Sequence, residues 1–393
     1  MRIPSKLKHL LHTKQLWWRY YIKHKDQIRP VVVDNIIKIL SCGLRTLGYA
    51  TFACRNPHCS HTKTVCFSCK SRFCNTCGYK ATQQWITQQN SVLPQTEWQH
   101  ITFTLPRELC LILQDNRHLL GDLSRLAAQV ILKVAKKKGV TPGIFTALHT
   151  FGRDLKWNVH VHLSTTRGGL CADQTTWQSL YFAKHSLMPM WRYEIINLLR
   201  NAYETLTLPP TLSTYTLWNR WLDQHYQKPW IVHLAKASKN HQKNVNYLGR
   251  YIKRPPLALS RLAHYDGHCV IFNYLDHNTK THRRFECTAE DFMTRLTQHM
   301  PEKGFRLIRY YGFLANRVRG KLLPKVYRLL DQPEKNAQPL HWPELLKASF
   351  GVDPLVCILC QSRLVLVKRT VGKTINALRR YHYHLALMKP IPA

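Results

Sequence analysis

The sequence predicts an α+β protein in which a helical, cysteine-rich N-terminal region precedes a domain of mixed strands and helices. Three observations lead to this prediction. Apolar residues recur at near-helical spacing through residues 1–48, cysteines crowd residues 49–80, and strand-like and helix-like runs alternate from about residue 98 to residue 320. The tail beyond about residue 333 is rich in Pro and basic residues and contains one Cys-x2-Cys pair.

Hydrophobic periodicity predicts the elements of the mixed region in order. Strands are expected at residues 101–106, 143–151, 157–166 and 229–236, and a hairpin at 268–276 and 280–288. Helices are expected at 109–138, 188–206 and 244–254, the last of them ended by two prolines.

Charge and composition narrow the class of partner. The chain has 393 residues, with 58 Lys and Arg against 21 Asp and Glu, so its formal charge is +37. Such a charge attracts polyanions, and nucleic acid is the obvious one. We see no signal peptide and no membrane-spanning run, so we expect a soluble cytosolic protein without membrane partners. In that compartment its 13 cysteines are expected to be metal ligands or free thiols.

The cysteine-rich segment predicts a structural zinc site. Tetrahedral zinc takes four thiolate or imidazole ligands, and closely spaced pairs supply two of them from one turn. Six cysteines exceed one site, so a second ion that shares the module with His58, His61 or Cys42 is an open alternative. We expect one core set of four, with Cys69 as the substitute ligand and Cys66 spare: Cys54, Cys59, Cys74 and Cys77.

A further pair, Cys357 and Cys360, has no neighbouring pair in the sequence. Two interpretations are equally supported. Either His382 and His384 complete a metal site there, or the pair belongs to a turn without metal.

The run from Trp157 to Thr166 alternates in polarity and contains His160-Val161-His162. Residues two apart on a strand point to the same face, so both imidazoles would project together while Val161 packs beneath them. Two imidazoles on one rigid strand can bind a divalent ion. Because the chain has 22 histidines, this motif alone is weak.

Tyr247 and Tyr251 are four residues apart in the predicted helix 244–254, so both phenols would share one face. Aromatic residues at this spacing commonly pack on a core. Here Gly249, Lys253 and the basic neighbourhood argue for a functional pair instead.

Four blocks in this order resemble the IS91 family of transposases: ITFTLPREL, TALHTFGRDLKWNVHVHL, NYLGRYIKR and FRLIRYYGFLANRVRGK. Members are two-tyrosine HUH single-strand endonucleases, related in chemistry to rolling-circle replication initiators and relaxases. The cysteine-rich module resembles the family's zinc-binding domain, although Cys54-x4-Cys59 is wider than the expected Cys-x2-Cys and Cys66 is additional.

The resemblance implies an HUH endonuclease core, in which a central antiparallel sheet flanked by helices carries the histidines and a neighbouring helix presents the tyrosines. It divides the chain into a helical, zinc-binding and DNA-binding domain at 1–97, a catalytic domain at 98–325 and a basic tail at 326–393.

The resemblance also implies the site residues. His160 and His162 would bind Mg²⁺ or Mn²⁺. Two imidazoles leave such an ion short of ligands, so a third polar ligand is expected. His149, on the neighbouring predicted strand, is the first choice and Asp154 the second. Tyr247 and Tyr251 would be the nucleophiles that form a 5′-phosphotyrosine, assisted by the ion or by Lys253 or Arg250. The chain has no GxxxxGK[ST] loop, so no nucleotide cofactor is expected.

DNA contacts are expected from basic residues near these blocks, namely Arg250, Arg254, Arg309, Arg317 and Arg319. Tyr310 and Tyr311 lie between them and are candidates for base stacking.

The resulting hypothesis is a bacterial, nucleoid-associated transposase that acts on single-stranded DNA at element ends and targets, with host replication proteins as further candidate partners. Two alternatives stay open. One is a rolling-circle replication initiator or relaxase with the same chemistry. The other is a non-enzymatic, zinc-dependent DNA-binding regulator whose histidines and tyrosines are structural.

Overall fold

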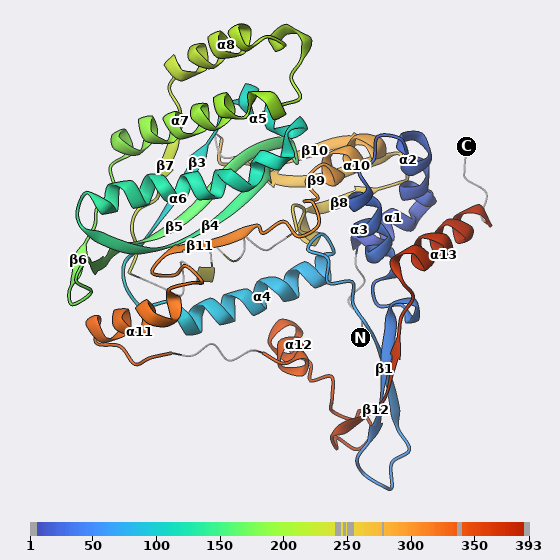
Figure 1. The fold of residues 1–393 in the computed structure, drawn as a ribbon. Coiled ribbons are helices and arrows are strands. Elements are labelled where there is room, and N and C mark those ends of the chain that lie inside the picture. Colours follow the sequence, from blue (N-terminus) through green and yellow to red (C-terminus); the bar gives the residue numbers. More distant parts are fainter. Residues whose placement is uncertain are drawn as a thin grey trace.

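The computed structural model describes residues 6–239, 245–246, 249, 255–276, 279–335 and 340–388. Its centre is a six-stranded antiparallel sheet in the order β11-β4-β5-β3-β7, with β6 added to β5 (Figure 1). The strands are β3 Trp98–Thr104, β4 Val140–Phe151, β5 Trp157–Cys171, β6 Trp177–Ser179, β7 Val232–Leu234 and β11 Ile308–Gly312.

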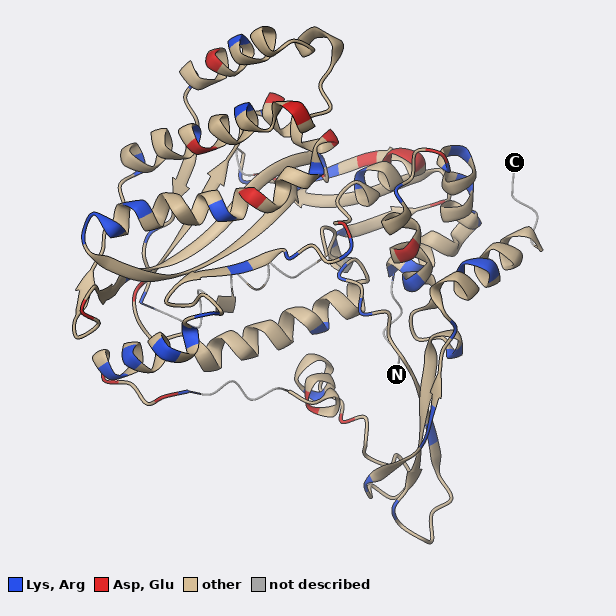
Figure 2. Cartoon of the chain, viewed as in Figure 1, with Lys and Arg blue, Asp and Glu red and all other residues tan. Residues whose placement is uncertain are grey.

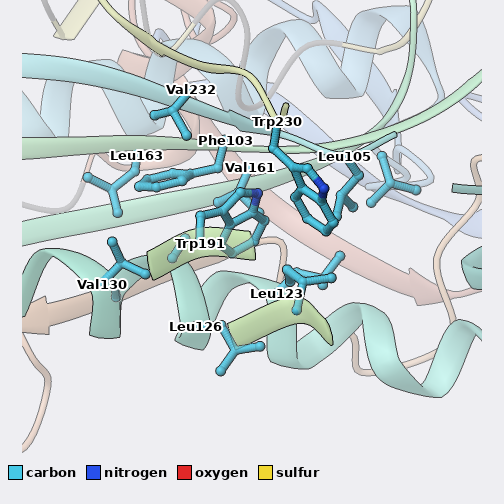
Figure 3. Close-up of a cluster of buried hydrophobic side chains, with 14 of the residues drawn as sticks. Phe103, Leu105, Leu123, Leu126, Val130, Val161, Leu163, Trp191, Trp230 and Val232 are labelled. Carbon is cyan, nitrogen blue, oxygen red and sulfur yellow. The ribbon is translucent and has the colours of Figure 1, made fainter. Parts of the chain in front are cut away.

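One face of this sheet is covered by helices that form the largest hydrophobic core. The helices on this side are α5 Arg107–Asp115, α6 Leu120–Lys136, α7 Lys184–Asn201 and α8 Tyr215–Gln227 (Figure 1). Figure 3 shows Phe103, Val161 and Leu163 from the sheet meeting Leu126 and Trp191 from the helices. All but Leu126 are fully buried, so strands β3 and β5 are fixed from this side.

The other face is covered by α4 Asn75–Val92 and α11 Arg319–Leu329 (Figure 1). Trp85 of α4 packs on Phe145 of β4 with ring centroids 5.8 Å apart, and its Nε1 donates to the hydroxyl of Tyr310 at 3.1 Å. The second core between α4, α11 and the sheet also contains Val245.

The N-terminal region is helical, as predicted. Three helices, α1 Lys6–His12, α2 Leu16–His24 and α3 Pro30–Ser41, form a third core with α10 Ala289–Thr297 and the antiparallel strands β8 Leu262–Tyr265, β9 Cys269–Leu275 and β10 His282–Thr288. The predicted hairpin is thus present as β9 and β10.

The C-terminal segment returns to the N-terminal region. β12 Leu364–Val371 pairs with β1 Gly48–Cys54, which also pairs with β2 Thr62–Cys66. α12 Trp342–Phe350 lies beside α4, and α13 Ile375–Leu387 packs on α3 (Figure 1). Residues 364–371 therefore lie in the same sheet as the cysteine-rich hairpin.

Most predicted elements are present, with two differences. The helix predicted at 109–138 is broken between α5 and α6. Asn116 lies at the break, and its buried side-chain amide accepts a hydrogen bond from the backbone amide of Thr207 at 2.7 Å and donates one to the carbonyl of Thr207 at 2.9 Å. The helix predicted at 244–254 lies largely outside the described residues; Val245, Asn246 and Gly249 within it are helical. Among the helices described, none is long and apolar enough to cross a membrane.

Candidate active site and cysteine clusters

Three histidines meet on the α4 side of the central sheet. In the register of β4 and β5, His149 lies opposite His160, and Ala147 lies opposite His162. One ring nitrogen from each histidine falls within 4.8 Å of the other two. The structure therefore brings His149 to the pair that the sequence singled out.

Alternation along β5 produces this arrangement. Val161 and Leu163 (Figure 3) are fully buried in the core on the opposite face, and so is Val159. His160 and His162 must therefore project toward α4. The backbone of β5 is hydrogen-bonded to β3 and β4 on both sides. The two imidazoles thus stand on a central strand, where little movement is available to them.

The hydrogen bonds of these rings direct their Nε2 atoms toward one another. Nδ1 of His160 lies 3.0 Å from the carbonyl oxygen of Asn158 and donates to it, which leaves Nε2 with a lone pair. The Nε2 atoms of His160 and His162 are 3.1 Å apart. An octahedral ion with ligands at about 2.1 Å separates neighbouring ligands by about 3.0 Å, so this spacing fits a shared divalent ion.

His100 on β3 is a fourth histidine of this cluster, and the sequence reasoning missed it. Its Nε2 lies 3.0 Å from Nδ1 of His162, its Nδ1 lies 3.3 Å from the hydroxyl of Ser164, and the two imidazoles are stacked. If the Nδ1–H of His162 donates to His100, the Nε2 of His162 carries the lone pair that an ion requires. The signal was missed because the strand begins at Trp98, earlier than predicted.

Burial keeps the imidazoles neutral. It lowers the pKa of His160 to about 4 and that of His100 to about 4, and it lowers the pKa of His162 well below its usual value. Neutral imidazoles are the form that binds metal ions.

Asp154, the second choice of third ligand, lies apart from this cluster. It sits in the turn between β4 and β5, where its carboxylate accepts from the backbone of Lys156 at 3.3 Å and pairs with the Lys156 ammonium at 3.2 Å. Among the described residues, the metal-like group on this sheet consists of histidines alone.

The tyrosine segment can be placed only through its described residues. Five predicted site residues lie outside them: Tyr247, Tyr251, Lys253, Arg250 and Arg254. Val245 is buried in the same core as Phe145 and Ala147, and Ala147 is the cross-strand neighbour of His162. Gly249 lies directly against Ile86 of α4, too close for a side chain. Val245 thus packs on the sheet face that carries the histidines, and Gly249 packs on α4.

The predicted DNA-contacting arginines do not share one surface. Arg309 pairs with Thr146 across β11 and β4 and lies against α6, on the face away from the histidines. Arg317 is exposed just before α11. Burial raises the pKa of Tyr310, and the charge of Arg319 opposes this, which places Arg319 near the α4 side of β11.

Tyr310 and Tyr311 are partly buried and packed on opposite faces of β11. β11 is held between α4 and α6, so Tyr310 packs against Trp85 and Phe145 while Tyr311 points into the opposite layer. Burial raises the pKa of both phenols. Base stacking by these two rings stays a prediction.

The two sides of the sheet differ in charge (Figure 2). The two helices that cover the histidine side, α4 and α11, contain Lys or Arg but no Asp or Glu. On the other side, each of α5, α6, α7 and α8 contains at least one carboxylate. The histidines therefore lie on the face whose covering elements are basic.

The cysteines form two clusters rather than the single set expected. Cys42, Cys69, Cys74 and Cys77 form the first cluster, with Sγ–Sγ distances of 3.6, 3.7 and 3.8 Å among them. Four sulfurs at about 2.3 Å from a tetrahedral zinc lie about 3.8 Å apart, so this cluster has the spacing of a Zn(Cys)₄ site.

Cys54 and Cys59 belong to the second cluster, with Cys357 and Cys360. The grouping of these two with Cys74 and Cys77 is therefore wrong, because β1 and β2 extend away from the start of α4 (Figure 1). The suggested pairing of Cys357 with His382 is also wrong: His382 is buried on α13 and bonds to the hydroxyl of Ser41 at 2.7 Å.

Two family models match the chain. A model described as "Transposase zinc-binding domain", of IS91 type, matches residues 13–105, and a model described as "Putative transposase" matches residues 143–321. The transposase for insertion sequence element IS801 of Pseudomonas savastanoi pv. phaseolicola is 42% identical over 392 residues, which cover 98% of this chain and 95% of that protein. The chain belongs to the IS91 family of transposases. A second relative, the "Putative transposase y4qJ" of Sinorhizobium fredii (strain NBRC 101917 / NGR234), is 26% identical over 85% of this chain and 88% of its own length. No solved structure matches significantly.

The site of this IS91-family transposase divides between the two matched regions. The first cysteine cluster and His100 fall in the zinc-binding match, which supports Zn²⁺ as a bound ion. His149, His160 and His162 fall in the transposase match. Cys357 and Cys360 lie beyond both.

Proposed function

We propose that this transposase nicks single-stranded DNA at the ends of its element and rejoins it through a covalent 5′-phosphotyrosine. The observation that carries the proposal is the shared face of the central sheet. Three histidines project from that face, and the segment of Val245 and Gly249 packs beside them.

His149, His160 and His162 would hold a Mg²⁺ or Mn²⁺ ion against the scissile phosphate. When bound, the ion supplies Lewis-acid polarisation of the phosphate. The protein orients the ligands: Asn158 fixes the ring of His160, and His100 fixes that of His162. Three imidazoles leave coordination positions open for phosphate oxygens and water, as an oxygen-preferring ion requires.

Tyr247 and Tyr251 would supply the nucleophiles. Residues two apart on a helix are rotated by about 200°. In the predicted helix both tyrosines would thus project away from α4, while Val245 and Gly249 face it.

In the reaction the phenol oxygen attacks the phosphorus, the bond from phosphorus to the 3′ oxygen breaks, and that oxygen leaves as a 3′ hydroxyl. The covalent bond retains the phosphoester energy, so the reverse attack by a 3′ hydroxyl rejoins DNA without a nucleotide cofactor. A second tyrosine lets the enzyme cleave another end or the target before the first is released.

Single-stranded DNA would approach on the histidine side, where the covering helices α4 and α11 contribute no carboxylates. Arg317 and Arg319, near the start of α11, would contact the DNA backbone. Arg250 and Arg254 would extend this contact along the tyrosine segment.

A covalent-adduct assay tests the proposal. Purified protein is incubated with labelled single-stranded oligonucleotides from the DNA that flanks its gene, with Mg²⁺ or Mn²⁺, and separated on denaturing gels. We expect a metal-dependent protein–DNA band, weakened or redirected by Tyr247→Phe or Tyr251→Phe and abolished by both together or by His160→Ala. Matched controls are Tyr193→Phe and His185→Ala, two exposed residues of α7.

An adduct that persists in the double tyrosine variant would refute the assigned nucleophiles. If no flanking strand gives an adduct while tight DNA binding persists in that variant, the chain acts as a zinc-dependent DNA-binding protein. Adducts formed on a plasmid origin but not on element ends would indicate a replication initiator or relaxase.

A further inference from the structure

Two cysteine pairs about 300 residues apart in the chain come together at the tip of the β1–β12 sheet. The Sγ atoms of Cys54 and Cys360 are 3.3 Å apart, and those of Cys59 and Cys357 are 3.8 Å apart. All four sulfurs lie within 4.8 Å of one another, and all four cysteines are free thiols. These separations are well beyond the roughly 2.05 Å of a disulfide bond.

The backbone around the cluster builds two turns that face each other. β12 pairs with β1 so that Leu364 lies opposite Cys54, which aligns the preceding Cys357–Cys360 turn with the end of β1. In that turn the amide of Gln361 donates to the carbonyl of Cys357 at 3.0 Å, and Gln361 adopts a left-handed conformation with φ of 60°. On the other side, the amide of Cys59 donates to the carbonyl of Asn56 at 3.0 Å. Each turn thus presents two sulfurs toward the other.

We propose that Cys54, Cys59, Cys357 and Cys360 bind a second Zn²⁺ ion, which fastens the C-terminal segment to the N-terminal hairpin. Four thiolates select a soft, tetrahedral ion, and four protein ligands leave no open position for substrate, so the site is structural. The separations of 3.3 and 3.8 Å are close to the roughly 3.8 Å expected between sulfurs around zinc.

A neighbouring histidine completes the surroundings of the site. Nδ1 of His61 lies 3.1 Å from the sulfur of Cys357. An N–H donor at this distance stabilises a metal-bound thiolate, as outer partners commonly do in metal sites. His61 follows Cys59 closely and the carbonyl of His61 accepts from the amide of Cys54 at 2.9 Å, so the same hairpin supplies ligands and donor.

The local hydrophobic core is too small to hold these segments together alone. Its described buried members are Ala50, Phe52, Cys357 and Leu364, with Trp342 stacked on Phe52 at 5.9 Å. Cores of this size commonly need a metal or disulfides for stability, and zinc binding contributes directly to folding. The ion would therefore strengthen the attachment that the pairing of β12 with β1 and the packing of α13 on α3 already provide.

Zinc content tests the proposal without reference to DNA cleavage. We expect the full-length wild-type protein to contain two zinc ions per chain by elemental analysis, with zinc surrounded by four sulfurs at about 2.3 Å by X-ray absorption. One ion per chain in the wild-type protein would overturn the proposal, and this measurement needs no variant that has to fold. A pair of these cysteines oxidised to a disulfide, seen as a loss of mass on intact-protein mass spectrometry, would also overturn it.

Variants then identify the site. Cys357→Ser with Cys360→Ser should reduce two ions to one, and so should Cys54→Ser with Cys59→Ser. The quadruple variant should also retain one ion, because both pairs serve the same site. Loss of both ions in the quadruple variant, or of none in either pair, contradicts the assignment. Cys171→Ser with Cys269→Ser, from outside both clusters, is the matched control and should keep two.

Discussion

Gly249 offers the sharpest test of where the tyrosine segment lies. A Cβ atom at this position would come within 2.7 Å of Cδ1 of Ile86, closer still to Cγ1 of that residue, and within 3.3 Å of Cε3 of Trp85. Carbon atoms in favourable contact are about 3.5 Å apart, so the segment or Ile86 must move by about 0.8 Å or more. The substitution Gly249→Ala therefore pushes the segment away from α4.

The expected effect is on catalysis more than on stability. A displacement of about 1 Å at a reacting group can reduce the rate about 100-fold. The clash costs about 1–3 kcal/mol of folding free energy, but Ala stabilises a helix by about 1 kcal/mol relative to Gly, so the net loss stays below about 2 kcal/mol. We expect DNA cleavage to fall about 100-fold while the protein remains folded.

A second substitution should restore the activity. Ile86→Ala removes the two carbon atoms that the new methyl group meets, so the double variant Gly249→Ala, Ile86→Ala should recover most of the lost rate. The matched control is Gly320→Ala in the first turn of α11, where an added methyl group would meet nothing within 4 Å, so cleavage should be unchanged.

The assay is the initial rate of covalent-adduct formation on a single-stranded oligonucleotide, with circular dichroism to check folding. Wild-type rates in Gly249→Ala would show that the segment does not depend on its contact with α4. A loss that Ile86→Ala fails to restore, in a folded protein, would show that the methyl group acts elsewhere.

Three further predictions follow from the site. His100→Ala should raise the Mn²⁺ concentration for half-maximal cleavage about 10- to 100-fold, because His100 positions His162 without binding the ion. Saturating Mn²⁺ should restore the maximal rate. An unchanged Mn²⁺ requirement would contradict this role of His100. Arg317→Gln should weaken single-strand binding, and the logarithmic slope of binding against salt, measured by fluorescence anisotropy, should fall by about 0.7. Arg309→Gln should leave that slope unchanged because Arg309 lies against α6. Equal effects of the two substitutions would refute the assignment of DNA binding to the histidine face. Cys42→Ser should lower zinc content by one ion per chain in elemental analysis, and full retention of zinc would remove Cys42 from the first cluster.

The sequence alone predicts that His160 and His162 share one face of a strand. It predicts only part of the set of residues that surround them. A period of two along β5 fixes which face His160 and His162 share, because Val161 must be buried. The partners on adjacent strands depend on register, which a single sequence does not reveal. His149 was chosen because it lies on the neighbouring predicted strand, whereas finding His100 required knowing that β3 lies beside β5.

The cysteine clusters show a different limit. Spacing identifies pairs that one turn can present, but it does not say which pairs meet. Cys54 and Cys59 lie near Cys74 and Cys77 in sequence, yet β1 carries the first two away from α4. Their partners come from the other end of the chain through the pairing of β1 with β12.

Strand β11 combines packing with the composition that indicated single-strand binding in residues 306–313. Arg residues interleaved with aromatic residues are typical of a surface that binds single strands, but β11 is packed on both faces and its side chains are partly buried. Arg309 and Tyr311 then face α6, and Tyr310 faces α4. The central sheet thus has one face that stabilises the domain through a large apolar core and one that combines packing with chemistry. β5 contributes to both, so a substitution at Val161 that loosens the core should also disorder the histidines beside it.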